Sequence, residues 1–346
     1  MSKINSIFQC NQTPFLIAEI GLSHDGSLGF AHSMIEAISK TGFDAVKFQT
    51  HIASHESSLD EPFRINFSYQ DKTRYDYWRR TEFTLEEWRG LKSHAEELGL
   101  IFLSSPFSIA AAQMLNEIGI CAWKISSGEI HSRRLLEWVA NTKKPIIAST
   151  GLTTFDEVNA LVKFLNSKAP NRYAILQCTT EYPTLAENVG INVLDKYISM
   201  FNCPIGLSDH SGVIWPAIIA ASRGARVIEV HATFSKCMFG PDTTSSLTIE
   251  QLKELKIGVD FTYKAISSDF DKNKNVNKKI SIRKLFSKSV AACRNIEKGK
   301  LLKEADIVWL KPGFGISEQD YDQKYSKKKL SRDISAGEFL QEGDFE

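Results

Sequence analysis

Two lysines lie inside short apolar segments, where a solvated charge is not expected. Lys47 and Lys124 each have large apolar neighbours on both sides, and a cation buried in this way needs an anionic partner. Hydroxyl groups end segments of the same kind: Ser104, Ser105, Ser126, Ser127, Ser149, Thr150, Thr179 and Ser208. Lysines beside several hydroxyls can bind phosphate and carboxylate groups, so the sequence predicts an anion site. Internal salt bridges to protein carboxylates are the alternative.

Two histidines, His210 and His231, end two further apolar segments. On adjacent strands, roughly 5 Å apart, two imidazoles at one level can share a cation. Imidazole ligands with open positions for oxygen suit a divalent ion, for which we expect Mn²⁺, with Mg²⁺ as the second candidate. Hydrogen bonding in the core is the alternative. Asp209 is adjacent to His210 but alternates off the inner face, so we do not expect it to be a ligand.

Carboxylates also occur at segment ends, and two of them can serve a polar substrate. One loop, His24-Asp-Gly26, follows the first segment, and another, Phe239-Gly-Pro-Asp242, follows the last. If the two loops are neighbours, Glu19 and Asp242 can converge on the hydroxyls of one ligand. Turn formation alone is the competing explanation for both glycine motifs.

Eight short apolar segments, separated by helix-length stretches, carry these residues. They are 15–21, 45–50, 100–106, 122–128, 145–150, 173–179, 205–210 and 227–233. Three intervening stretches start with a capping-box pattern, at Thr84, Thr154 and Thr248. The rhythm predicts an α/β protein, a (β/α)₈ TIM barrel over 1–267, with its chemistry at the carboxyl ends of the strands.

The barrel pattern is interrupted once and then ends. Residues 51–80 form a long connection rich in aromatic and arginine side chains, for which a lid or an interface arm and a solvated insertion are both open. Residues 268–282 are polar and lysine-rich, which predicts a linker. Residues 283–346 have short alternating segments and glycine turns, typical of a small β-rich domain.

Overall composition excludes several classes of protein. The chain has 346 residues and a net charge of +1, which gives no sign of a nucleic acid or membrane partner. No run approaches the ~18 apolar residues of a membrane helix, and no signal peptide is visible. The six cysteines include no C-x-x-C pair, which favours free thiols. We therefore expect a cytoplasmic protein.

Ordered motifs along almost the whole chain resemble the sialic acid (N-acetylneuraminate) synthase family, which includes legionaminic and pseudaminic acid synthases and spore-coat polysaccharide relatives. The motifs are Ile17-Ala-Glu-Ile-Gly21, Asp44-Ala-Val-Lys-Phe-Gln-Thr50, Ser105-Pro-Phe107, Lys124-Ile-Ser-Ser-Gly-Glu129, Ser149-Thr-Gly151, Gln177-Cys-Thr179, Tyr182-Pro183, Gly206-Leu-Ser-Asp-His-Ser211, Glu229-Val-His231 and Gly240-Pro-Asp242. The tail resembles the family's antifreeze-like β-clip domain through Ser289-Val-Ala-Ala292, Lys311-Pro-Gly-Phe-Gly-Ile316 and Arg332-Asp-Ile334.

The resemblance implies a transferase that condenses phosphoenolpyruvate with an N-acylated mannosamine-type sugar, and it implies a role for each matching residue. Phosphoenolpyruvate would be bound by Lys47, Ser105, Lys124, Ser127, Ser149 and Ser208. The metal would be bound by His210 and His231. The sugar would contact Glu19, Gln49, Tyr182, Asp242 and, from the tail, Lys311. The catalytic groups would be Glu129, Glu19 and Lys124. The resemblance also implies a domain-swapped homodimer.

Three positions depart from the family pattern. Asp25 and Thr180 stand where relatives commonly have Asn, and Lys311 replaces an arginine that reaches the acyl group of the sugar. Lysine lacks the planar fork of arginine, so the acceptor can differ from N-acetylmannosamine, for example a 2,4-diacetamido sugar. Two other functions remain open: a Schiff-base aldolase that uses Lys47 or Lys124, and a carbohydrate-binding barrel without activity.

Overall fold

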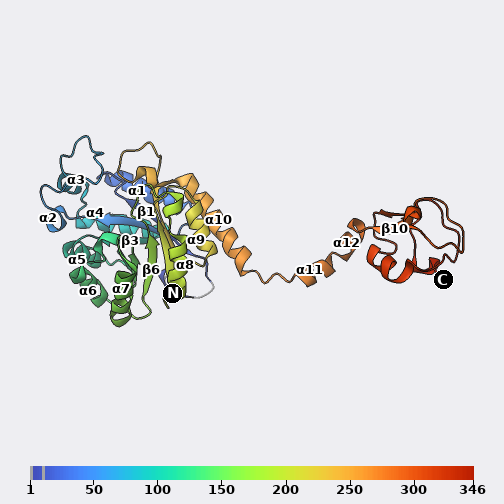
Figure 1. Ribbon diagram of the computed structural model, residues 1–346. Helices are drawn as coiled ribbons and strands as arrows, with labels where there is room; N and C mark the ends of the chain where they lie inside the picture. The colour runs from blue at the N-terminus through green and yellow to red at the C-terminus, as the bar shows by residue number, and fades with distance from the viewer. Residues whose placement is uncertain (1–2, 10–11) are drawn as a thin grey trace. The chain divides into compact units, whose positions relative to one another are not determined.

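The computed structural model describes residues 3–9 and 12–346, and the chain divides into two compact units. The first unit is Met1–Ser267 and the second is Ser268–Glu346. In the first unit, helices surround a bundle of strands (Figure 1). The stretch 268–282, expected to be a linker, contains helix α11 (Lys272–Lys278) and the start of α12 (Ile280–Phe286).

The strands of the first unit form a nearly closed parallel barrel. They are β1 (Phe15–Gly21), β2 (Ala45–Thr50), β3 (Ile101–Pro106), β4 (Trp123–Ile125), β5 (Ile146–Ser149), β6 (Tyr173–Cys178), β7 (Ile205–Asp209) and β8 (Val227–Thr233). Backbone pairing follows the order β3-β2-β1-β8-β7-β6-β5-β4, and the end strands β3 and β4 contact each other. A short strand, β9 (Leu247–Thr248), pairs with β8. The predicted TIM-type barrel is confirmed.

Helices connect the strands and cover the outside of the barrel. They are α1 (Leu28–Ser39), α4 (Leu85–Glu97), α5 (Ile109–Glu117), α6 (Arg133–Asn141), α7 (Phe155–Lys168), α8 (Ile191–Met200), α9 (Trp215–Ser222) and α10 (Ile249–Ser267). Capping boxes at Thr84 and Thr154 satisfy the first amides of α4 and α7. Thr248 and Gln251 exchange the same two bonds at the start of α10. All three predicted caps are confirmed.

Side chains along each strand point alternately outward, to the apolar core under the helices, and inward, where they form layers inside the barrel. The inward-facing apolar side chains form one buried cluster with Ile4 and Ile7 from the N-terminal segment. The strand members include Ile17, Ala45, Leu103, Ala122, Ile147, Leu176 and Val227. Two positions further along the same strands stand Glu19, Lys47, Ser105, Lys124, Ser149, Cys178 and Glu229. Because side chains on a strand repeat every second residue, this set forms a polar layer above the apolar one. The polar layer lies at the carboxyl ends of the strands.

The long connection after β2 is ordered and packs on the barrel. It contains α2 (Ala53–Glu56) and α3 (Arg74–Thr81), and Tyr77 and Trp78 of α3 are buried in an aromatic cluster. Arg80 donates to Asp71 and Asp25, both at 2.8 Å, and so ties the connection to the loop after β1. Asp25 is one of the departures from the family pattern, and its carboxylate pairs with the guanidinium of Arg80.

The second unit has a small core of its own around β10 (Ser289–Ala292) and β11 (Ile307–Leu310), which pair antiparallel. A short helix, α13 (Glu318–Asp320), and a π-helical turn (Tyr321–Tyr325) follow. Within 3–9 and 12–346, no helix is both long and apolar enough to span a bilayer. Cys10 lies outside the described residues, and the other five cysteines are free.

Candidate active site

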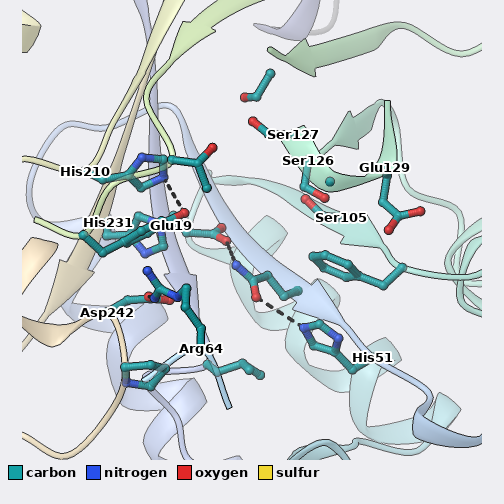
Figure 2. Close-up of a pocket in the computed structure, with 18 of the residues that line it drawn as sticks. Glu19, His51, Arg64, Ser105, Ser126, Ser127, Glu129, His210, His231 and Asp242 are labelled. Carbon is teal, nitrogen blue, oxygen red and sulfur yellow. Dashed lines mark hydrogen bonds and ion pairs between the residues drawn. The ribbon is translucent and has the colours of Figure 1, made fainter. Parts of the chain in front are cut away.

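A cavity of about 450 Å³ opens at the carboxyl ends of the barrel strands. Its wall comes from two sources: the polar layer of the strands, and the connection 51–80 with the loops around it. Figure 2 shows residues of both kinds turned toward one space. The cavity is therefore where the topology of the barrel predicts a ligand site.

The two lysines lie at the base of this cavity, beside two carboxylates. Lys47 Nζ is 2.7 Å from Glu19 Oε2 and 3.8 Å from Glu229 Oε1, and Lys124 Nζ is 3.1 Å from Glu229 Oε1. All four side chains are buried. In this structure protein carboxylates neutralise the lysines, which is the alternative that the sequence left open. The arrangement does not exclude an anionic ligand, because a lysine can bond to more than one acceptor.

Burial and mutual contact shift the pKa of these groups. Burial raises the pKa of Glu229, but Lys124 and Lys47 outweigh it and hold that pKa at about 2. The pKa of Lys124 is lowered, chiefly by burial and further by Lys47, against the opposing effect of Glu229. Glu229 is thus the ionised counter-ion, while Lys124 lacks full compensation for its lost hydration. An additional anion nearby would favour the charged form of Lys124.

The serines around the lysines differ in how they are bonded. Ser105 Oγ accepts from Lys47 Nζ at 3.2 Å, and Ser208 Oγ donates to Glu229 at 3.1 Å. Ser127 Oγ accepts from the backbone N–H of Gly151. The hydroxyls of Ser126 and Ser149 are buried and have no protein partner among the described residues. Buried polar groups are normally bonded, so these two hydroxyls are available to a ligand.

His210 and His231 come together as the strand register requires, with ring centroids 5.1 Å apart. His210 Nδ1 lies 3.0 Å from the carbonyl oxygen of Thr179, so this nitrogen donates and Nε2 carries the lone pair. Burial, and then His231, lower the pKa of His210 to about 3, which leaves it in the neutral form that binds metals. Nδ1 of His231 is buried and has no partner among the residues that the structure describes.

These two imidazoles fit a divalent ion with most of its coordination positions open. No group of three or more His, Cys, Asp or Glu side chains within 3–9 and 12–346 is arranged to hold a metal. Further ligands would be other oxygen groups, from the protein, substrate or water. Asp209 is bonded to the backbone and hydroxyl of Ser211 and does not line the cavity.

The expected sugar contacts form a second group, which shares Glu19 with the lysine layer. Gln49 Nε2 donates to Glu19 Oε1 at 3.0 Å. The hydroxyl of Tyr182 lies 3.0 Å from His210 Nε2, and burial followed by the charge of Asp242 raises the pKa of Tyr182. Asp242 also lines the cavity.

Two expected site residues stand apart from these contacts. Glu129 lines the cavity and accepts from Ser132 at 2.7 Å; burial, and then the charge of Glu56, raise its pKa. Lys311 belongs to the second unit, where its ammonium lies 5.5 Å from the ring of Phe286. The structure therefore brings together all the expected site residues of the barrel, while Lys311 belongs to the second unit.

Several wall residues have no role assigned from the sequence, among them Glu229, Arg64, His51 and Glu56. Glu229 neutralises both lysines. The sequence feature that could have identified it is its position on the same strand as His231, two residues earlier. Arg64 stacks over Tyr182 at 4.1 Å and pairs with Asp242 at 3.1 Å. His51 and Glu56 form a further pair. The last three lie in the connection 51–80, whose contacts no strand periodicity can predict.

The chain matches two known protein families and several of their members. The NeuB family matches residues 34–270, and the SAF domain matches residues 287–346. The chain is 31% identical over 342 residues to pseudaminic acid synthase of Campylobacter jejuni, covering 98% of both chains. It is 32% identical to N,N'-diacetyllegionaminic acid synthase of the same organism, covering 90% of this chain and 94% of that one.

A solved structure agrees with both sequence matches. The N-acetylneuraminic acid synthetase of Leptospira borgpetersenii, in complex with citrate, superposes with a TM-score of 0.69 at 26% identity. The alignment covers 79% of this chain and 93% of the other. The resemblance drawn from the motifs is thereby confirmed, and the chain belongs to the NeuB family, with a SAF domain at its carboxyl end.

Proposed function

We propose that this chain condenses phosphoenolpyruvate with an N-acylated mannosamine-type sugar to give a nine-carbon 2-keto acid and phosphate. The observation that carries the proposal is the base of the cavity, where Lys47 and Lys124 lie beside the unpartnered hydroxyls of Ser126 and Ser149. Such a base suits a small ligand that bears both a phosphate and a carboxylate. The names of the relatives, which include pseudaminic and legionaminic acid synthases, support the same reaction class.

In the proposed complex the strand layer binds phosphoenolpyruvate. Lys47 and Lys124 face its anionic groups, and Ser105, Ser127 and Ser149 supply hydroxyls, with Ser208 adding one from β7. Binding exchanges part of the lysine–glutamate pairing for lysine–ligand pairing, so it compensates the lost hydration of Lys124. The enol carbon is then held toward the acceptor side of the cavity.

The acceptor aldehyde is placed between the histidines and the group of Glu19, Gln49, Tyr182 and Asp242. A divalent ion bound by His210 and His231, which we expect to be Mn²⁺, supplies Lewis acidity to the aldehyde oxygen. Carbon 3 of phosphoenolpyruvate forms a bond to the aldehyde carbon, and water adds at carbon 2. Loss of phosphate then leaves the keto group, so one sugar, one phosphoenolpyruvate and one water give one keto acid and one phosphate.

Glu129 is our candidate for orienting or deprotonating the attacking water. Its carboxyl lines the cavity, and its raised pKa makes it a stronger base than an exposed glutamate. If the carboxylate is the working form, activity falls as the pH drops through this raised pKa. Glu129→Gln should flatten that acidic limb as well as lower kcat.

The acceptor is proposed to be N-acetylmannosamine or a diacetamido relative. Thr180 lines the cavity with a buried hydroxyl that has no partner within residues 3–9 and 12–346, so it can bond to a polar group on the sugar. We also propose a homodimer in which Lys311 of one copy reaches the barrel of its partner. Light scattering of the purified full chain tests the dimer.

Phosphate release from phosphoenolpyruvate tests the reaction directly. The purified chain is incubated with Mn²⁺ and a panel of N-acetylmannosamine and 2,4-diacetamido hexoses, and phosphate and keto acid are quantified together. We expect phosphate and keto acid to form in equal amounts with at least one sugar. Release that does not depend on any sugar, or no release at all, contradicts the proposal.

One observation favours a second function. Burial lowers the pKa of Lys124, which is the condition under which a lysine forms a Schiff base. A class I aldolase would be trapped covalently by borohydride in the presence of a keto substrate. The synthase needs no imine, so the proposed reaction predicts no trapped adduct at Lys124 or Lys47.

A further inference from the structure

A chain of hydrogen bonds leads from the base of the cavity into the connection 51–80. Glu19 accepts from Gln49 Nε2 at 3.0 Å, and Gln49 Oε1 lies 3.3 Å from His51 Nε2. On the other side of the same ring, His51 Nδ1 lies 2.6 Å from Glu56 Oε1. Figure 2 shows the inner part of this chain, from His51 through a glutamine to Glu19.

The direction of each bond is fixed from the inner end. Glu19 is paired with Lys47 and offers only acceptor oxygens, so Gln49 must turn its NH₂ group toward it. The amide oxygen of Gln49 then faces His51, whose Nε2 must donate. Because Nδ1 faces a carboxylate oxygen of Glu56, both ring nitrogens meet acceptors. The two contacts therefore need a proton on Nε2 and another between Nδ1 and Glu56 Oε1.

The ring of His51 is also clamped between two aromatic side chains. Trp78 stacks on it at 3.9 Å between centroids with an interplanar angle of 5°, and Phe107 stacks at 4.2 Å and 19°. The side chains of His51 and Glu56 are only 4% and 8% exposed. A ring stacked between two aromatic faces cannot turn to form other bonds.

A buried ion pair is a weak means of stabilising a fold, because apolar residues of similar size often do as well. This pair, however, lies in the cavity wall, together with Trp78 and Phe107. Its inner end is Gln49, one of the expected sugar contacts. The location suits a group that orients the site better than one that only supports the barrel.

We propose that His51, held by Glu56, is a positioning residue for the acceptor half of the site. It holds the amide oxygen of Gln49, keeps that side chain in the position from which its NH₂ group reaches Glu19, and so sets the donors and acceptors that both present to the sugar. The inference rests on the proposed function for its kinetic consequence only. The orientation of Gln49 itself can be measured whatever the reaction.

Three variants distinguish a role of His51 in positioning Gln49 from a role in stabilising the fold alone. His51→Leu removes the donor, and His51→Gln restores one amide donor. His55→Gln is the matched control, since His55 is exposed on α2, next to Glu56, and does not line the cavity. For His51→Leu we expect the KM for the acceptor to rise about 10- to 100-fold, the range for losing a bond within a charged network. The KM for phosphoenolpyruvate should stay within about 2-fold of wild type. His51→Gln should recover most of the loss.

Crystal structures of wild type and His51→Leu give a readout that does not depend on turnover. We expect the 3.0 Å contact between Gln49 and Glu19 to lengthen or be lost in the Leu variant, because the amide oxygen of Gln49 no longer has its anchor. An unchanged contact overturns the inference, as does an equal rise of both KM values that follows a lowered Tm. If the wild type turns over no sugar, the proposed function fails, and the position of Gln49 still decides this inference.

Discussion

The wall of the cavity has two halves that are built differently. The strand half, with Lys47, Lys124 and Glu229, is fully buried, and its charges compensate one another over contacts of 2.7 to 3.8 Å. The loop half, from residues 51–80, includes Arg64, whose side chain is 41% exposed. Backbone pairing fixes the first half, while the second is held by side-chain pairs. We therefore propose that the strand half performs the condensation and that the loop half determines which acceptor sugar binds.

The largest expected effect comes from breaking the strand half. Lys124→Met leaves Glu229 with Lys47, at 3.8 Å, and the hydroxyl of Ser208, at 3.1 Å. Loss of one partner of a buried pair costs about 3–5 kcal/mol, so we expect a lower free energy of unfolding as well as loss of turnover. Urea unfolding and phosphate release are the measurements. Lys163→Met, at an exposed position on α7, is the control; a stable, active Lys124→Met variant would remove the strand half from the chemistry.

Arg64 tests the loop half, with a smaller expected effect. Its guanidinium stacks on Tyr182 and pairs with Asp242, both of which are expected to touch the sugar. Arg64→Gln should raise the KM for the acceptor by about 3- to 10-fold with little change in kcat, because partly exposed charge pairs contribute about 1 kcal/mol. The same change at Arg79, an exposed residue of α3, should have no effect. A loss confined to kcat would argue that Arg64 takes part in the chemistry.

The difference between the halves also limits what the sequence could predict. A residue period of two placed Glu19, Lys47 and Lys124 on one inner face, and the parallel order of the strands brought His210 beside His231. The aromatic and charged pairs of residues 51–80 follow no period. His51 comes directly after β2, yet its partner Glu56 lies on the short helix α2, whose packing depends on tertiary contacts. Lys47 pairs with two carboxylates, so its neutralisation too required the structure.

The smallest effect is a pH dependence of the loop half. Burial raises the pKa of Asp71, but bonds from Arg80 and Ser68 outweigh it and hold the pKa below its usual value. The stability that Asp71 contributes is therefore present above the unfolded pKa of about 3.9 and is lost as the pH falls through the lower folded pKa. Asp71→Asn should remove about 1 kcal/mol at pH 7 and less near pH 3.

Unfolding of this variant by urea at several pH values checks the prediction, and Asp60→Asn, at an exposed site in the same connection, is the control. A destabilisation of Asp71→Asn that stays constant from pH 7 to pH 3 would show that the charge of Asp71 does not hold the connection in place.

A crystal structure with phosphoenolpyruvate and Mn²⁺ tests the central claim most directly. We predict that the phosphate and carboxylate oxygens contact Lys47, Lys124 and the hydroxyl of Ser149 at the base of the cavity. The metal should lie between His210 and His231. Phosphoenolpyruvate bound instead at Arg64 and Arg74 in the loop half, with the lysine–glutamate pairs unchanged, would contradict this division of the site.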